Sequence, residues 1–124
     1  MPQVRPAAVA DQFYPADIAT LQAQLDRYLS DARPFLTGGR PKALIAPHAG
    51  YVYSGPIAGS AYASIVPFRD EIERVVLLGP SHRVYLRGLA APAADAFETP
   101  LGRVPIDRAA VTALLDLPQV AISS

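Results

Sequence analysis

Cysteine is absent from this 124-residue chain, and so is tryptophan. Without cysteine the chain has no disulfide, no cysteine-ligated zinc, no iron–sulfur cluster and no thiol nucleophile of its own. An excess of one charge is also missing, because Lys plus Arg and Asp plus Glu each number 11. No basic surplus is available to neutralise nucleic-acid phosphates or to grip an anionic membrane. We therefore expect no nucleic-acid partner and no membrane partner.

Long hydrophobic runs are missing too. The apolar stretch at residues 7–10 is too short for a secretory signal, and no run approaches the roughly 18 residues of a membrane-spanning helix. The cytoplasm is the default compartment for such a chain. Its length and its 51% hydrophobic residues suit one compact domain over residues 1–124, with a single core.

The first part of the chain predicts one helix after an extended start. Residues 1–16 contain prolines that resist a helix. Asp17 is a suitable N-cap, and Pro34 prevents much continuation of the helix. The apolar residues that follow Asp17 at helical spacing are Ile18, Leu21, Leu25, Tyr28 and Leu29.

A strand–helix–strand unit is predicted next. Residues 42–46 and 74–78 are short apolar runs of the kind found in buried strands of a parallel sheet. Gly55 and Pro56 predict the start of the connecting helix, which should end near Pro67. We expect this helix to bury a face made of Ile57, Ala58, Ala61, Tyr62 and Ile65. A crossover of this kind brings the loops after both strands to the same edge of the sheet.

The last part of the chain predicts short strands and one more helix. Asp107 should cap a helix through Leu115, and residues 99–102 should form a turn. The predicted strands here are residues 86–92, 104–106 and 119–124. The last of them stops at the chain end, which we interpret as a cut on the C-terminal side. Together the elements predict an α/β fold, with a partly parallel sheet flanked by helices.

His48 and His82 are the only histidines, and each follows one strand of the predicted crossover. Ligands of open α/β sheets bind at the carboxyl ends of the strands, so two imidazoles there can converge on one metal or substrate. Two imidazoles and one carboxylate form the facial triad of non-haem iron oxygenases. Asp95 and Glu98 are the acidic residues in the expected loop after His82, but their spacing matches no ligand signature. A solvated carboxylate explains each of them as well as metal binding does, and a histidine beside a strand can be a simple turn residue.

The segment of residues 47–56 holds two glycines, two tyrosines and the expected helix start. Such a loop brings backbone N–H groups close to an anion, and its tyrosine rings can line a pocket. Alternatively, Gly50 and Gly55 serve turn geometry while Tyr51 or Tyr53 packs on the core. The residues alone leave both interpretations open.

Four motifs occur in an order and at a spacing that resemble the Memo family along nearly the whole chain. They are Val4-Arg5-Pro6 with Gln12-Phe13-Tyr14-Pro15; Ala46-Pro47-His48-Ala49-Gly50-Tyr51 continuing to Ser54-Gly55; Leu78-Gly79-Pro80-Ser81-His82; and Thr99-Pro100-Leu101-Gly102. The Memo family is similar in fold to the class III extradiol ring-cleaving dioxygenases, which hold a non-haem iron at the strand ends. The resemblance implies a single Memo-like domain that corresponds to the N-terminal half of such a fold.

The resemblance also implies a divalent-metal site, with iron as the expected metal and copper or zinc as alternatives. His48 and His82 match two ligand positions of the family. The pocket residues expected beside them are Phe13, Gly50, Tyr53 and Ser81. The third ligand is a cysteine in Memo relatives and a carboxylate in the dioxygenases, and both come from a later half beyond the residues of this sequence. Asp11 stands where relatives usually carry glycine.

Two functions follow from these expectations. The first is a metal-binding, dioxygenase-like protein that loses turnover unless Asp95, Glu98, a partner subunit or water completes the site. The second is a non-catalytic module that binds a short peptide or an anion at the helix start, as eukaryotic Memo relatives are described as doing with phosphotyrosine peptides. An inert remnant is the third alternative. The expected ligand is a small molecule or short peptide, and a homo-oligomer or a complementary chain would complete the fold.

Overall fold

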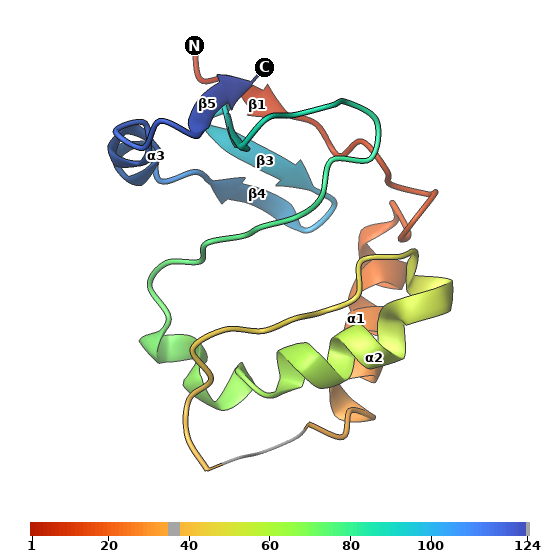
Figure 1. Cartoon of the computed structure of the whole chain (residues 1–124). Helices are drawn as coiled ribbons and strands as arrows, with labels where there is room; N and C mark the ends of the chain where they lie inside the picture. The colour runs from red at the N-terminus through yellow and green to blue at the C-terminus, as the bar shows by residue number, and fades with distance from the viewer. Residues whose placement is uncertain (35–37, 124) are drawn as a thin grey trace. The chain divides into compact units, whose positions relative to one another are not determined.

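The computed structural model describes residues 1–34 and 38–123. The chain divides into two compact units, and each is described by itself. Unit 1 consists of Met1–Ala7 and Leu77–Ser124, and unit 2 is the continuous stretch Ala8–Val76. Helices and mostly parallel strand pairs make the fold α/β, as the sequence predicts (Figure 1). Among the described residues, no helix has the length and apolar character needed to cross a membrane.

Two small sheets form unit 1 (Figure 1). Their strands are β1 (Val4–Arg5), β2 (Leu89–Pro92), β3 (Ala96–Thr99), β4 (Gly102–Pro105) and β5 (Val120–Ser123). Strand β3 lies between β1 and β4, parallel to β1 and antiparallel to β4. Strands β2 and β5 form a second, parallel pair. The sheet is therefore partly parallel, as expected.

The turn between β3 and β4 and helix α3 (Arg108–Leu114) follow the sequence closely. The predicted turn joins β3 to β4, and the Thr99 hydroxyl donates to the Gly102 carbonyl at 2.8 Å. Asp107 is the N-cap of α3, as predicted, because its carboxylate accepts from the backbone N–H of Ala110 at 2.9 Å. Val111 is the buried residue of α3.

The other strands of unit 1 differ from the prediction in their extent. β2 begins later than residue 86, because Gly88 has a φ of 75° and a side chain there would clash with the carbonyl of Gln119. β3 is a strand where we expected a loop, so the loop placement of Glu98 is wrong, whereas Asp95 lies in the bend just before the strand, as expected. Pairing with β1 on one side and β4 on the other stabilises this short strand. β5 confirms the last predicted strand over residues 120–123, while Ser124 lies outside the described residues.

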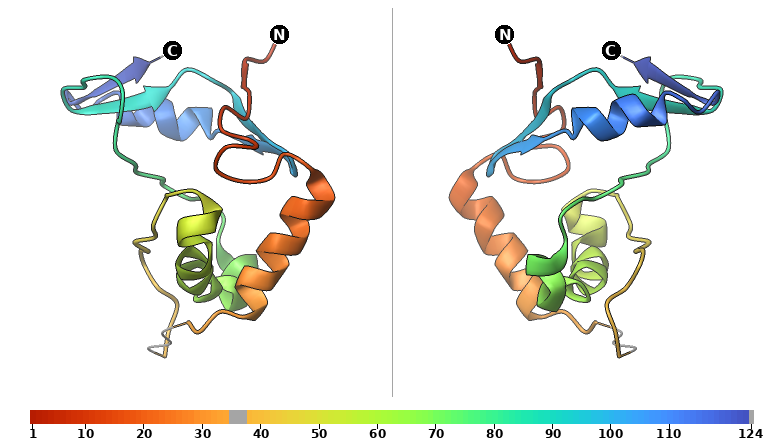
Figure 2. Two further views of the ribbon diagram at one scale, coloured as in Figure 1. Left: turned by 90° about the vertical axis from the view of Figure 1, so that its right-hand side faces the viewer. Right: turned by 90° about the vertical axis from the view of Figure 1, so that its left-hand side faces the viewer.

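Unit 2 contains helices α1 (Ile18–Ser30) and α2 (Tyr51–Ala63) and the 3₁₀ helix η1 (Val66–Glu71). The two α-helices pack against each other, as both views of Figure 2 show. Asp17 caps α1 as predicted, accepting from the backbone N–H of Thr20 at 2.8 Å. Leu21, only 3% exposed, is the buried residue of α1.

Helix α2 begins at Tyr51 rather than at the predicted Gly55. Its first turn forms upstream of Pro56, with the N–H groups of Tyr53 and Ser54 donating to the Gly50 carbonyl at 2.9 and 3.1 Å. Pro56 then lies inside the helix, where it removes one backbone hydrogen bond without ending the helix.

The predicted buried face of α2 is also wrong. Ile57 and Tyr62 are 66% and 47% exposed, whereas the buried residues are Ser54, Gly55 and Gly59. A Cβ on Gly55 would come within 2.6 Å of the Tyr28 ring, and one on Gly59 within 2.7 Å of the Tyr28 carbonyl. The two helices approach so closely that only small residues fit between them.

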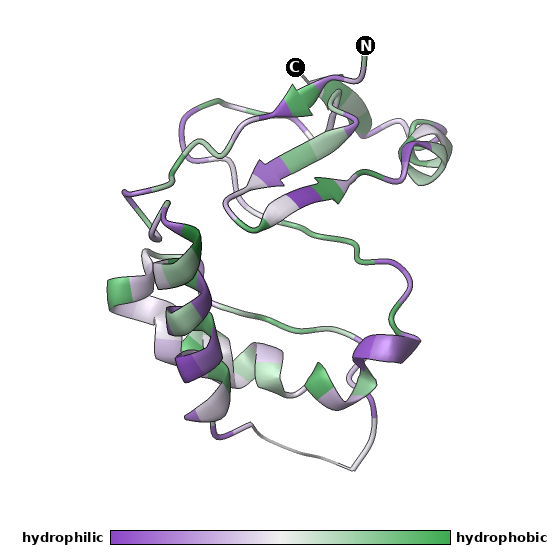
Figure 3. Ribbon diagram, turned by 180° about the vertical axis from the view of Figure 1, so that it is seen from behind, coloured by the Kyte–Doolittle hydropathy of each residue, from purple (hydrophilic) through white to green (hydrophobic). Residues whose placement is uncertain are grey.

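The two strands of the predicted crossover, residues 42–46 and 74–78, do not form. Ile45 is 99% exposed, and Val75 to Leu78 are each about three-quarters exposed. Neither segment is paired with a strand that the structure describes. Apolar content predicts a strand, but a strand also needs a neighbour to take its backbone hydrogen bonds. Figure 3 shows these apolar stretches as green chain outside the helices and strands.

Candidate functional site

His48 lies in an irregular, exposed segment that ends at Gly50, the N-cap of α2. The backbone directly after it is anchored on two sides. The Ser54 hydroxyl donates to the Ala49 carbonyl at 3.0 Å, and the Tyr51 N–H donates to the Phe13 carbonyl at 2.8 Å. The position of His48 is thereby tied both to α2 and to the turn around Phe13.

Three of the expected pocket residues are neighbours beside this segment. A Cβ on Gly50 would lie 3.6 Å from the Cα atom of Phe13 and 3.7 Å from the Tyr53 ring. Phe13 is 47% exposed and Tyr53 84% exposed, so the two rings stand at the surface. The structure thus brings Phe13, Gly50 and Tyr53 together beside the segment that contains His48.

Tyrosine rings pack behind the same segment. The Tyr51 ring centroid lies 5.8 Å from that of Tyr14 and 6.0 Å from that of Tyr28, the latter pair edge-on at 81°. The Tyr28 hydroxyl donates to the Tyr51 carbonyl at 3.4 Å. Burial raises the pKa of Tyr51, and the neighbouring Tyr14, Tyr62 and Tyr28 raise it further. Tyr51 is therefore a neutral packing residue, not an acid–base group near neutral pH.

His82 and Ser81 lie in unit 1, in an exposed segment without regular structure. The Ser81 hydroxyl donates to the Val84 carbonyl, which makes a tight local turn. His48 belongs to unit 2, so the convergence of the two imidazoles on one ligand stays a prediction.

Asp95 connects several segments of unit 1 through hydrogen bonds and an ion pair. Its Oδ2 atom accepts from the backbone N–H of Gln3 at 2.7 Å, and its Oδ1 atom lies 3.8 Å from Nε of Arg108. Its backbone N–H donates to the Gln3 carbonyl at 2.7 Å, and its carbonyl accepts from Ile106 at 2.9 Å. Arg108 also donates to the Pro92 carbonyl at 2.8 Å. A metal on Asp95 would compete with these contacts.

Glu98 makes one looser interaction. One of its oxygens lies 3.9 Å from Nε of Arg103 across the β3–β4 hairpin, and both side chains are about half exposed. The two candidate third ligands thus differ, because Asp95 ties together several elements and Glu98 forms a surface ion pair.

The donor set for a metal is incomplete in the part of the chain described here. No group of three His, Asp or Glu side chains is arranged to hold an ion among residues 1–34 and 38–123. Two imidazole nitrogens are a partial set, since a typical site for iron or zinc takes at least three protein ligands.

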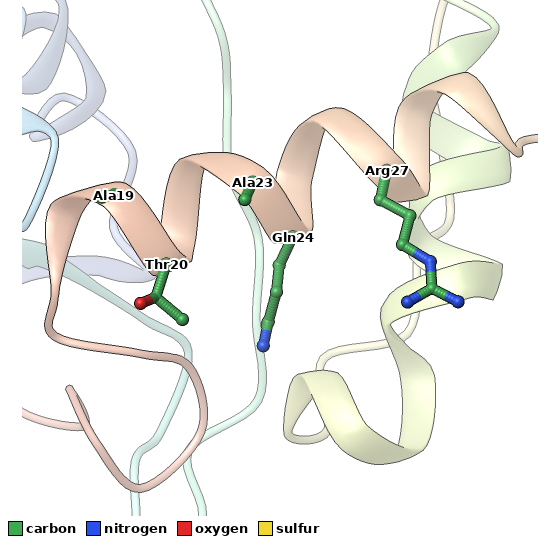
Figure 4. A pocket seen from close by; sticks show the side chains of 5 residues that line it. All are labelled: Ala19, Thr20, Ala23, Gln24 and Arg27. Atoms are coloured by element: carbon green, nitrogen blue, oxygen red, sulfur yellow. The ribbon is translucent and has the colours of Figure 1, made fainter.

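A depression on the surface of α1 contains none of the predicted site residues. Its lining comes from a single helix, as Figure 4 shows, and consists of Ala19, Thr20, Ala23, Gln24 and Arg27. An open surface lined by one helix lacks the converging polar groups of a ligand site.

Two structural features were not predicted from the sequence: the close packing of Tyr28 against α2, and the contacts that Asp95 makes within unit 1. The close approach of Tyr28 to α2 was signalled by Gly55 and Gly59, small residues four positions apart on one helix face. Asp95 contacts both Gln3 and Arg108, which lie far apart in the sequence, and no local sequence pattern predicts such contacts.

Comparison with known proteins identifies the family. A family model described as "Memo-like protein" matches residues 5–123. Protein MEMO1 of Xenopus tropicalis is 44% identical over 105 residues, which cover 84% of this chain and 34% of that protein. A MEMO1 family protein of Aquifex aeolicus is 42% identical over 106 residues, covering 85% and 37%. The chain belongs to the Memo family.

A further Memo relative, the MEMO1 family protein of Pyrococcus furiosus, is 38% identical over 123 residues. That alignment covers 95% of this chain and 40% of the relative. The family match therefore includes both histidines and, apart from Val4, all four motifs, while the chain spans little more than a third of the length of these relatives.

Proposed function

We propose that this Memo-family chain contributes His48 and His82 to a divalent-metal site, with iron preferred over copper or zinc. The supporting observation is the anchored segment after His48, which the Phe13 carbonyl and the Ser54 hydroxyl hold at the start of α2. A fixed backbone reduces the conformational entropy that an imidazole loses when it binds a metal. We also assign the chain to the cytoplasm.

The residues present fit such a site only in part. Neutral imidazoles are suitable ligands for iron, copper and zinc, and a bound iron would supply the oxygen chemistry of an extradiol dioxygenase-like protein. With no third ligand among the described residues, we derive no reaction step and expect binding of modest affinity. The proposal therefore assigns metal binding to these residues and no oxygenase reaction.

The second candidate is a module that binds a short peptide or an anion without metal. The exposed first turn of α2 favours it, since Val52 is 86% and Tyr53 84% exposed. The helix N-terminus argues against it, because the N–H groups of Tyr51 and Tyr53 already donate to the carbonyls of Phe13 and Gly50. An anion would find few backbone donors there, so we rank this candidate second.

Metal binding by the purified chain separates the two candidates. The protein should be prepared without a metal-affinity tag, loaded with Fe²⁺ under anaerobic conditions, and measured by elemental analysis and calorimetry. We expect His48→Ala and His82→Ala each to weaken Fe²⁺ binding by about tenfold or more. Val84→Ala is the matched control, because Val84 is 65% exposed near His82 and its aliphatic side chain has no donor atom for iron.

Two results would contradict the metal proposal. One is Fe²⁺ binding that His48→Ala and His82→Ala leave unchanged. The other is a chain that takes up no metal but binds an acidic peptide, with an affinity that falls in Tyr53→Ala. That second result would establish the peptide-binding candidate in its place.

A further inference from the structure

Ser54, in the first turn of α2, is a polar side chain that the fold buries. It is 8% exposed, whereas Val52 and Tyr53 beside it are exposed. A buried hydroxyl needs a hydrogen-bond acceptor, because burying it without a partner costs free energy. The acceptor that Ser54 uses therefore indicates what this side chain does.

The Ser54 hydroxyl donates to a carbonyl that lies outside its own helix. A serine inside a helix commonly bonds back to the carbonyl four residues earlier. Ser60 of the same helix does so, since its hydroxyl donates to the Pro56 carbonyl at 3.2 Å. The Ser54 hydroxyl instead lies 3.0 Å from the Ala49 carbonyl, five residues earlier, and 3.5 Å from the carbonyl of Gly50. The shorter contact is the one with Ala49, so Ser54 holds backbone that precedes α2.

Ala49 directly follows His48, so this bond acts next to the imidazole. One trans peptide unit separates the two residues, with about 3.8 Å between their Cα atoms. Two residues further on, the Tyr51 N–H donates to the Phe13 carbonyl at 2.8 Å. Both contacts lie within unit 2. The bond from Ser54 is made by a side chain, so a point substitution can remove it and leave the backbone contact in place.

We propose that Ser54 is a positioning residue for His48. It is not a ligand itself. By fixing the Ala49 carbonyl, it limits the directions in which the His48 side chain can leave the backbone. A ligand side chain held in this way loses less conformational entropy when it binds a metal, and this raises affinity. The effect on Fe²⁺ rests on the metal site proposed above, whereas the effect on the motion of the segment does not.

Ser54→Ala tests the proposal, because it removes the hydroxyl and leaves a good helix former. In the metal-free chain, we expect the backbone order parameters of His48 and Ala49, measured by NMR relaxation, to fall from about 0.85 toward about 0.6. The affinity for Fe²⁺, measured by anaerobic calorimetry, should fall about three- to tenfold. Ser54→Thr keeps a hydroxyl and should restore both quantities.

Ser60→Ala is the matched control. It makes the same change in the same helix, where the hydroxyl bonds to the Pro56 carbonyl and not to the backbone beside His48. It should alter neither the order parameters nor the affinity for Fe²⁺. Urea denaturation of all the variants separates positioning from stability, because a purely structural role would lower the unfolding midpoint and leave the affinity of the folded chain unchanged.

The order parameters decide the positioning role even if no metal binds. A fall in Ser54→Ala, in an original chain that binds no Fe²⁺, would support the positioning role and contradict the metal site. Unchanged order parameters in Ser54→Ala, or an equal fall in Ser60→Ala, would overturn the positioning role. An original chain that binds Fe²⁺ no more tightly than Ser54→Ala does would also overturn it.

Discussion

Gly59 lies so close to Tyr28 that a methyl group on it would come within 2.7 Å of the Tyr28 carbonyl oxygen. Replacing Gly59 with alanine would ordinarily stabilise a helix by about 1 kcal/mol. Here the clash is with backbone, and overpacking of this kind costs roughly 1–3 kcal/mol. We expect Gly59→Ala to lower the free energy of unfolding by about 1–2 kcal/mol, as measured by urea denaturation.

Gly39→Ala is the control for that prediction. No described atom lies within 4 Å of the position its Cβ would take, and its φ is not in the left-handed region. Its unfolding midpoint should equal that of the original chain or exceed it slightly. Equal midpoints for Gly59→Ala and the original chain would show that α1 and α2 can separate without cost.

Asp11 occupies a backbone conformation that favours glycine. Its φ is 63°, and its carboxylate accepts from the N–H of Ala16 at 2.8 Å. Asp11→Gly loses the hydrogen bond but removes the left-handed strain, so we expect stability within about 1 kcal/mol of the original. Asp11→Ala loses the hydrogen bond and keeps the strain, so it should be less stable than Asp11→Gly by about 1 kcal/mol.

The same denaturation experiment, run on both Asp11 variants, measures the difference. An alanine variant as stable as the glycine variant would contradict the left-handed conformation at this position. The result bears on the family as well, because the resemblance places a glycine at this position in relatives.

The capping of α1 by Asp17 predicts a dependence on pH. Hydrogen bonds from the hydroxyl and the backbone N–H of Thr20 lower the pKa of Asp17 below its ordinary value of 3.8. A carboxyl with a lower pKa in the folded state stabilises it fully above pH 3.8, and this stabilisation disappears as the pH falls through the lowered value. We expect helical circular dichroism to weaken over that acidic range.

Asp17→Asn separates this effect from general acid unfolding. Asparagine caps a helix about as well as aspartate but does not titrate. The acid-induced loss of helical signal should therefore be smaller in Asp17→Asn than in the original chain. Superimposable pH profiles for the two proteins would rule out a contribution of the Asp17 cap.

Asp95 and Glu98 should differ in their effect on stability. Asp95→Ala removes the hydrogen bond to Gln3 and the ion pair with Arg108. Because the Asp95 carboxylate is 44% exposed, we expect a loss of about 1–2 kcal/mol rather than the full value of a buried charged hydrogen bond. Glu98→Ala removes an exposed pair 3.9 Å long and should cost less than about 0.5 kcal/mol.

Thermal and urea unfolding of the two variants gives the comparison. Equal losses for Asp95→Ala and Glu98→Ala would mean that the contacts around Asp95 carry little energy. The expected order instead identifies Asp95 as a residue that unit 1 needs for its fold.

Local signals in the sequence predicted the local structure well. Asp17 and Asp107 cap the helices that were expected to follow them, and the turn at residues 99–102 joins two strands. Each of these features depends on residues within four positions of one another.

Predictions that needed a distant partner were less successful. Residues 42–46 and 74–78 have the composition of strands, but composition does not provide the neighbour that completes a ladder of hydrogen bonds. β3 was missed for the opposite reason, because β1 and β4 stabilise a segment that looks like a loop. At the candidate site, Phe13, Gly50 and Tyr53 are neighbours, while their role in a pocket stays a prediction, and the contacts of Asp95 could not be foreseen.

Unit 1 consists of two stretches that are separated in the sequence by unit 2, and this affects the order in which its contacts form during synthesis. β1 is synthesised before Ala8–Val76, but its partner β3 emerges only after all of that stretch. Unit 2 is continuous and its contacts are available as soon as it has left the exit tunnel. Gln3 and strand β1 are therefore made before unit 2 but acquire their native hydrogen bonds only after unit 2 has been synthesised.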